Sequence, residues 1–435
     1  MKALLLTYVF FLPFVRLWFL PIVDAKLQPT ELIFIPLFVL AIREFGWELV
    51  ALPRAVLVVF AAYLVTNFLS AGISGDYRAM LEAVGRVYLV ALALIFRVGV
   101  QRWGSEALWR WFTYGILVFA ATSYGGYALA LMGFDNRMVQ LYGNYPYFGD
   151  VLRAAGFTGG GGMLILVLWL PILYGWYRGR RGQRHWLYLV LALLPLAFLT
   201  WAKELLLLAL GMVLLDPWWA RGRGGRGSSL LRVGLITVVS LLFWFGTHLI
   251  VQTSQRGGEN ELTGTPYTSE RILLRVQGYQ LLETSYLSLK RAALSVWFKH
   301  PWTGVGPGQF NAALPAEQSA GNYPDHLPLY DPHSTWLGAL AETGLAGFAA
   351  LFAMVTVLTD LFLRRLPKSL EDSVPGQATV SVVAVFFLLC LLLSVSKDVL
   401  NFRFLWFAVG LLLGGLGKYP LPLPLRPRPQ RTFVA

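Results

Sequence analysis

Residues 331–363 read DPHSTWLGALAETGLAGFAALFAMVTVLTDLFL, a short polar stretch followed by an apolar run that begins at Trp336. The run is long enough to cross a bilayer as a helix, which needs roughly 17 to 25 residues. His333 therefore lies where the chain enters a membrane, and an ionisable side chain there is costly to keep unless it has a function. This stretch predicts a helical membrane protein with a candidate functional histidine at one membrane boundary.

The composition indicates the same class of protein. Hydrophobic residues make up 57% of the chain and charged residues 14%. A water-soluble domain of this size could not bury so many apolar side chains away from water. The net charge of +13 comes from short Arg clusters between apolar runs, so a cytoplasmic membrane face explains it better than nucleic acid does. Cys390 is the single cysteine, which excludes an internal disulfide and a cysteine metal site.

Apolar segments along the chain predict an all-α fold with about twelve transmembrane helices. The long apolar stretch Leu187–Leu215 is interrupted by Lys203 and Glu204. A charged pair at the centre of one helix would cost on the order of a few kcal/mol, so we predict a reversal there that places both charges at the outer surface. The predicted spans are residues 3–23, 27–42, 54–73, 79–98, 107–132, 161–178, 186–201, 203–216, 230–250, 334–363, 378–396 and 401–417.

Along the chain, loops rich in Lys and Arg alternate with loops that have few of them. This pattern is expected if the basic loops are cytoplasmic. Both termini are then cytoplasmic. Residues 1–250 hold the first nine spans, 251–333 form a large outer loop, 334–417 hold the last three spans, and 418–435 form a cytoplasmic tail. The basic residues predicted inside are Arg43, Arg54, Arg97, Arg102, Arg110, Arg178, Arg180, Arg181, Arg184, Arg221, Arg223, Arg226, Arg232, Arg364, Arg365, Lys368, Lys418, Arg426, Arg428 and Arg431.

Two polar segments are predicted on the outer side. The first is residues 133–160. It overlaps the stretch NYPYFGDVLRAAGFTGGGG (144–162), which is too rich in Gly, Pro and aromatic residues to be a helix. In the loop 251–333, residues 255–265 are polar and predict an irregular segment. From Ser269 to Trp297 apolar residues recur at helical spacing, which predicts one or two amphipathic helices on the membrane surface.

The outer side also gathers cations with few carboxylates nearby. Arg offers planar paired donors and Lys a point charge, and both suit phosphate. In a bacterial-type envelope, the phosphate presented at this face belongs to a lipid carrier, so a lipid diphosphate is the ligand that the set indicates. The alternative is ordinary contact with lipid headgroups. The cations are Arg153, Lys203, Arg271, Arg275, Lys290 and Arg291.

His333 is the candidate for chemistry. A neutral imidazole beside an acceptor hydroxyl can act as a general base, which contributes about a hundred- to ten-thousand-fold in rate; a structural histidine is the alternative. Paired carboxylates of the DxD type and a His/Asp cluster with metal-ligand spacing are both missing from the sequence, so neither a metal nor a cofactor is expected.

Two motifs in order, HPWTGVGPGQF (300–310) and HSTWLGALAETGLAGF (333–348), resemble the O-antigen ligase and polymerase superfamily. The resemblance implies a GT-C-like fold and a metal-independent, inverting glycosyltransferase of the bacterial inner membrane. Such an enzyme moves a glycan from a polyprenyl (undecaprenyl) diphosphate to an acceptor hydroxyl at the periplasmic face. It also implies that His333 is the base and that cations hold the diphosphate.

The chain departs from the family pattern at several of these positions. Lys203 follows Ala202 where the family shows Ser-Arg, and Ser334 stands where Asn often follows the histidine. Arg153 lies in a matching element without its usual Pro-Asn. The family arginine before the first motif has Arg291 as its nearest substitute. The residues expected to bind the diphosphate are therefore Lys203, Arg291, Arg275, Arg271 and Arg153.

The acceptor is left open by the sequence. Because no soluble domain is appended, ligation to lipid A core, in lipopolysaccharide assembly, and polymerisation on another carrier-linked repeat are expected ahead of transfer to Ser or Thr of a protein. Of these two, ligation is placed first. A transporter or flippase for the lipid-linked glycan is an alternative of another class. The absence of repeated halves and the outer position of the cations argue against it.

Overall fold

The computed structural model describes residues 1–15, 29–145, 149–158, 160–216, 226–253, 268–363 and 375–415. Its helices are α1 (Lys2–Phe11), α2 (Pro29–Phe45), α3 (Arg54–Ser74), α4 (Tyr77–Trp103), α5 (Ser105–Leu131), α6 (Gly161–Arg180), α7 (Trp186–Phe198), α8 (Leu205–Leu214), α10 (Arg226–His248), α11 (Ser285–Lys299), α12 (Phe310–Ser319), α13 (Thr335–Leu363), α15 (Pro375–Leu393) and α16 (Arg403–Gly415). Its strands are β1 (Val139–Tyr145), β2 (Gly149–Ala154), β3 (Leu249–Thr253), β4 (Thr268–Val276) and β5 (Tyr279–Thr284).

Each predicted span overlaps a helix in the described part of the chain. Among the described residues, five helices are long and apolar enough to cross a membrane, namely α3, α4, α5, α6 and α13. The multi-pass helical architecture is thus confirmed, whereas the crossing of all twelve segments stays a prediction. The end of the first predicted span, the loop predicted at 255–265 and the predicted tail at 418–435 lie outside the described residues.

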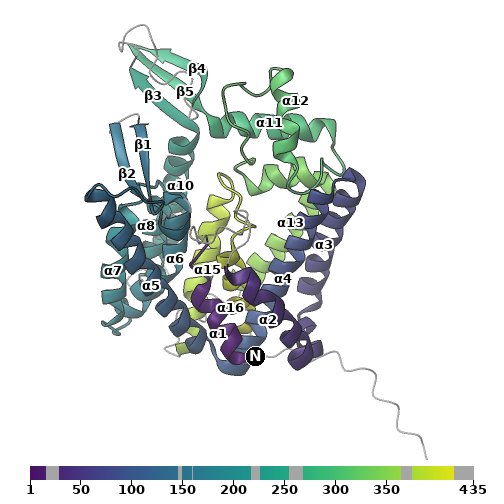
Figure 1. Cartoon of the computed structure of the whole chain (residues 1–435), viewed down its shortest axis with the longest axis vertical. Helices are drawn as coiled ribbons and strands as arrows, with labels where there is room; N and C mark the ends of the chain where they lie inside the picture. Colours follow the sequence, from purple (N-terminus) through teal and green to yellow (C-terminus); the bar gives the residue numbers. More distant parts are fainter. Residues whose placement is uncertain are drawn as a thin grey trace, which may run out of the picture.

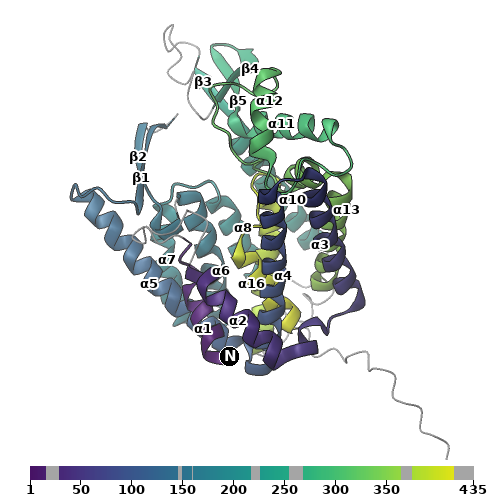
Figure 2. The same ribbon diagram turned by 45° about the vertical axis from the view of Figure 1, so that its right-hand side comes forward.

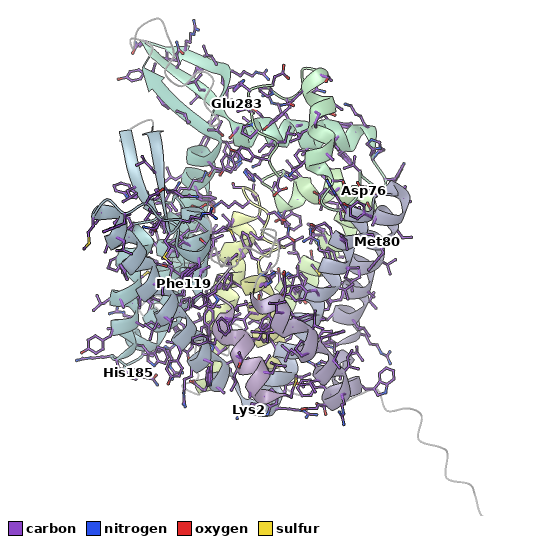
Figure 3. The ribbon with its side chains drawn as sticks, viewed as in Figure 1. Lys2, Asp76, Met80, Phe119, His185 and Glu283 are labelled. Atoms are coloured by element: carbon purple, nitrogen blue, oxygen red, sulfur yellow. The ribbon has the colours of Figure 1, made fainter. Side chains whose placement is uncertain are left out.

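The helices form a bundle, and the strands gather with α11 and α12 at one end of it (Figures 1 and 2). Figure 3 places Lys2 and His185 at the opposite end, whereas Glu283 and Asp76 lie toward the end that carries the strands. The first two residues belong to segments predicted inside, and the other two belong to segments predicted outside. The two predicted sides therefore lie at opposite ends of the bundle.

Close helix packing surrounds the centre of the bundle. α16 lies against α4, and a Cβ atom at Gly410 would be 2.5 Å from Cβ of Phe96. Small residues at such a contact let two helices in a membrane approach each other. Trp109 and Tyr174 stack with ring centroids 3.9 Å apart and join α5 to α6. The core is thus built from glycine contacts and buried aromatic rings.

The region from Thr268 to Thr284 corrects the sequence prediction. Strands β4 and β5 form an antiparallel hairpin there, and β3 pairs with the other edge of β5. The turn residues Gln277 and Gly278 both have positive φ, 45° and 83°, which is the geometry that closes two-residue hairpins. The predicted amphipathic helix is wrong for this half, and only α11 is helical.

The two sequence motifs form one structural unit. Gly344, with φ of 63°, breaks the regular geometry of α13, and the first motif packs into that break. The amide of Leu345 donates to the carbonyl of Pro301 at 2.8 Å, and the amide of Gly306 donates to the carbonyl of Glu342 at 2.8 Å. This contact fixes the beginning of α13 relative to α11, which leads into the first motif.

Candidate active site

His333 lies just before α13 and has φ of 47°. A residue other than glycine in this left-handed region costs on the order of 1–3 kcal/mol, so neighbouring contacts must hold it. Those contacts come from Thr335, whose amide donates to Ser394 O at 2.9 Å and whose hydroxyl accepts from Val399 N at 2.9 Å. The hydroxyl of Thr335 also donates to Lys397 O at 3.2 Å. The loop between α15 and α16 therefore anchors the backbone beside His333.

The imidazole of His333 lies against two tyrosine rings. Its centroid is 4.8 Å from that of Tyr286 on α11 and 5.7 Å from that of Tyr330. The ammonium of Lys203 lies 4.3 Å from the centroid of Tyr286, a favourable position for a cation over an aromatic face. Tyr286 thus contacts both the candidate base and Lys203, one of the predicted phosphate-binding cations.

Lys203 lies in the turn between α7 and α8, at the break that the sequence predicts. Its neighbour Glu204 is only 2% exposed, so this carboxylate is buried within the protein at the reversal. Glu204 is buried because Lys397 approaches it, with Nζ 2.5 Å from Oε1, and a buried charge needs such a partner. The pair joins the α7–α8 turn to the loop that anchors His333.

Two more cations lie near this turn. Arg153 on β2 donates from Nε to the carbonyl of Thr200 at 2.7 Å. Lys290 on α11 is 8% exposed, and its Nζ contacts Nε2 of His248. Nδ1 of His248 lies 2.7 Å from the carbonyl of Trp244; since a carbonyl only accepts, this nitrogen carries the proton and Nε2 accepts from the lysine.

The cations act on one another, which places them in one group. Burial is the main reason that the pKa of Lys203 falls to about 8, and Glu204 opposes this shift. The positive charges that lower this pKa further belong to Lys397, Arg153 and Lys290. Burial also lowers the pKa of Lys290 to about 8. At neutral pH these side chains remain mostly charged, so they form a positive site suited to an anion.

The same environment keeps His333 neutral. Burial, followed by the charges of Lys397, Lys203 and Lys290, lowers the pKa of His333 to about 4. Its imidazole is therefore unprotonated at neutral pH and can accept a proton. The arrangement joins a proton acceptor to an anion-binding group of cations. We call His333, Arg153, Lys203, Lys290 and Lys397 the inner site.

The other predicted cations lie elsewhere. Arg291 forms an ion pair with the buried carboxylate of Glu283. Arg291 and Arg271 line a separate pocket, whose lining does not include the residues of the inner site. Arg275 is exposed on β4. The structure thus brings together His333, Lys203, Arg153 and Lys290, and it does not bring Arg271, Arg275 and Arg291 into that group.

Lys397 was not singled out by the sequence, although a signal for it exists. The pair Lys397–Asp398 separates two apolar runs, as Lys203–Glu204 does. A charged pair between two spans is costly to keep without a partner, so the reasoning that selects Lys203 also selects Lys397. That Lys397 pairs with Glu204 could not be read from the sequence, because nearly two hundred residues separate them.

Comparison with known families agrees with the two motifs. Residues 203–352 match the family model described as O-Antigen ligase. The match begins at Lys203 and includes Lys290, His333 and both motifs, and it confirms the predicted similarity to the O-antigen ligase and polymerase superfamily, a family of glycosyltransferase-like enzymes. A search of curated proteins finds no match to the chain.

Proposed function

We propose, from the match of residues 203–352 to the O-antigen ligase family, that this chain is a membrane glycosyltransferase. Its donor is a glycan on undecaprenyl diphosphate, and its acceptor is a hydroxyl group at the periplasmic face, with ligation to lipid A core as the reaction in lipopolysaccharide assembly. The observation that carries the proposal is that one ring, Tyr286, contacts both His333 and the ammonium of Lys203, which places a proton acceptor beside the cations of the inner site.

The reaction is a single displacement. The acceptor hydroxyl gives its proton to His333 while its oxygen attacks the anomeric carbon of the donor sugar. The bond from that carbon to the diphosphate oxygen breaks, and the diphosphate leaves with the bonding electrons. The configuration at the anomeric carbon is inverted. Positive charges already in place where negative charge develops lower the barrier of such a step.

Lys203, Lys290 and Arg153 hold the diphosphate in this proposal. Lys203 and Lys290, each with a pKa of about 8, gain an anionic partner when the donor binds. An opposite charge nearby favours the protonated form of a lysine, so donor binding and protonation support each other. Arg153 adds a guanidinium, which can bind a phosphate through two parallel hydrogen bonds. Lys397 stabilises Glu204 and adds to the positive potential.

The test is product formation by the full chain reconstituted in vesicles with an undecaprenyl-diphosphate glycan and a lipid A core acceptor. Mass spectrometry is expected to detect a new glycosidic bond. His333→Ala should lower the rate about a hundred- to ten-thousand-fold while donor binding persists. The matched control is His300→Ala, because His300 is an exposed histidine of the same outer region.

Other outcomes would redirect the proposal. Normal transfer by His333→Ala would remove the base role. Product formed only with a second carrier-linked repeat would identify a polymerase, and product formed only with a protein would identify an oligosaccharyltransferase. Movement of unaltered lipid-linked glycan across the vesicle, without any new bond, would identify a flippase and contradict the enzyme proposal.

A further inference from the structure

A second polar pocket lies at the end of the molecule that carries the strands. It has a volume of about 300 Å³ and is lined by side chains of β4, α11, the end of α12 and the loop after α12. Figures 1 and 2 show these elements together, beyond the bundle of long helices. A volume of this size is at the lower end of the range for small-ligand sites. The proposed reaction leaves this pocket without a role.

The loop that forms one wall is held by hydrogen bonds to α11 and α12 and by one within the loop. Asn322 donates from Nδ2 to Oε2 of Glu317 at 2.8 Å and to Oγ of Ser295 at 3.1 Å. The hydroxyl of Tyr323 donates to the carbonyl of Pro328 at 2.7 Å. Since the amide nitrogen of Asn322 is used in this way, its oxygen is the atom that can accept from a ligand. The wall is formed before a ligand arrives.

The lining combines donors and acceptors in nearly balanced charge. Arg271 and Arg291 supply guanidinium donors, and Asp325 supplies a carboxylate. Behind Arg291 lies its partner, the buried Glu283. Counted together with Glu283, the two arginines are matched by two carboxylates, so the strong excess of positive charge that suits free phosphate is missing. Vicinal hydroxyl groups of a sugar each donate and accept, so they fit this combination.

The position of the pocket relative to the inner site indicates which sugar it could bind. Tyr286 and Lys290 of α11 belong to the surroundings of His333, whereas the next residue, Arg291, lines the pocket. The two sites therefore lie on different faces of one helix, which is about 10–12 Å wide with its side chains. A glycan whose reacting end lies at His333 could extend around α11 to the pocket only if it has several sugar units.

We propose that this pocket is a saccharide subsite, which binds a sugar unit remote from the bond that forms. The inference rests on the proposed function, since it extends the substrate of the same reaction. Either glycan could occupy the subsite, the one on the donor or the one on the acceptor, and both offer the same hydroxyl chemistry. A contact that is made equally in the ground state and the transition state changes KM without changing kcat, and this is the behaviour that we expect of a subsite that only holds the glycan.

The experiment uses Arg271→Ala in the reconstituted full chain. Arg137→Ala is the matched control, because Arg137 is an exposed arginine outside the pocket. KM and kcat are measured with a long acceptor and a one-sugar donor, and then with a one-sugar acceptor and a long donor. Arg271→Ala should raise KM about tenfold for the long glycan that occupies the subsite. The kcat of Arg271→Ala should stay unchanged, and its KM for the one-sugar substrate should also stay unchanged. If KM rises only for the long acceptor, the subsite binds the acceptor glycan, and if it rises only for the long donor, the subsite binds the donor glycan. A KM that is unchanged with both substrate pairs overturns the proposal.

Binding is measured separately from activity. Saturation-transfer NMR with lipid-free core oligosaccharide, and with lipid-free repeat-unit oligosaccharide, should show a signal for at least one of them in the parent chain. This signal should disappear in Arg271→Ala and persist in His333→Ala. Equal signals in the parent chain and Arg271→Ala would overturn the subsite, as would displacement of the sugar by inorganic phosphate. Should the parent chain form no glycosidic bond, this result still decides the subsite, so the two failures are distinguishable.

Discussion

At the scale of single residues, the inner site predicts how the rate depends on pH. The neutral form of His333 is the active base, and a pKa of about 4 means that activity is lost only as the pH falls toward that value. Lys203 and Lys290 must be protonated to hold the diphosphate, and their pKa values of about 8 mean that binding weakens as the pH rises past 8. We expect kcat/KM to be bell-shaped between these limits, since it reports the free enzyme.

The measurement is the initial rate at low donor concentration across the pH range at constant ionic strength. Lys203→Arg is the informative variant, because a guanidinium stays protonated over the whole range. It removes one of the two titrating lysines, so the basic limb should become less steep, while its midpoint stays near 8 because Lys290 still titrates there. A basic limb near 10.4 in the parent chain, the ordinary value for a lysine, would contradict the assignment of Lys203 and Lys290.

The pair of Glu204 and Lys397 leads to a second prediction at this scale. Lys397→Met leaves the carboxylate of Glu204 buried without its partner, and breaking such a pair typically costs about 3–5 kcal/mol. We expect a clear fall in the unfolding midpoint in detergent. The double variant Lys397→Met/Glu204→Gln removes both charges and should recover most of the lost stability.

Activity separates a structural role of Lys397 from a functional one. Lys397 also contributes positive potential at His333, and the double variant does not restore it. We therefore expect the double variant to be stable and still impaired in donor binding, with the acid limb of its pH profile shifted upward. A double variant with the parent's donor affinity would show that Lys397 only neutralises Glu204.

At the scale of elements, the break in α13 depends on one glycine. A Cβ atom at Gly344 would lie 2.3 Å from the carbonyl carbon of Trp302, and the φ of 63° is itself unfavourable for other residues. Gly344→Ala should therefore separate the first motif from α13 and cost about 2–4 kcal/mol. Gly72→Ala in α3 is the control, because a Cβ there meets nothing within 4 Å. A parent-like unfolding midpoint for Gly344→Ala would contradict this account.

The elements also show what the sequence could predict. The helices follow from apolar runs of membrane length, and the reversal at Lys203 follows from the cost of a charged pair inside a span. The hairpin of β4 and β5 was missed because Arg271 and Arg275, four residues apart, together with the adjacent Leu273 and Leu274, also fit a helical pattern. The signal against a helix was local, the Gln277–Gly278 turn.

The inner site was only partly predictable. The type and position of His333 and Lys203 indicate their chemistry, because each is an ionisable residue at a predicted membrane boundary. The sequence gives no means of separating the cations of the inner site from the cations outside it. Like Arg153 and Lys203, the residues Arg271, Arg275 and Arg291 are basic and are predicted on the outer side. Their separation depends on which face of α11 and which strand carries each side chain, and this is decided by tertiary packing.

At the scale of the whole molecule, the inner site requires segments from across the chain to meet at one end. Five segments each contribute a side chain or a hydrogen bond that holds the backbone, namely β2, the α7–α8 turn, α11, the start of α13 and the loop before α16. Since the proposed donor and acceptor meet at the periplasmic face, this end must face the periplasm. The proposed function therefore requires this orientation of the bundle in the membrane. The same orientation is predicted by the alternation of loops that are rich and poor in basic residues.

Cysteine labelling tests this orientation. His185→Cys places a thiol at the end predicted inside, and Arg137→Cys places one in the segment predicted outside; both positions are exposed. The natural Cys390 is buried and provides the background. In intact spheroplasts, an impermeant maleimide should label Arg137→Cys at once and His185→Cys only after permeabilisation. The reverse order would place the inner site in the cytoplasm, where a reaction on a periplasmic acceptor could not occur.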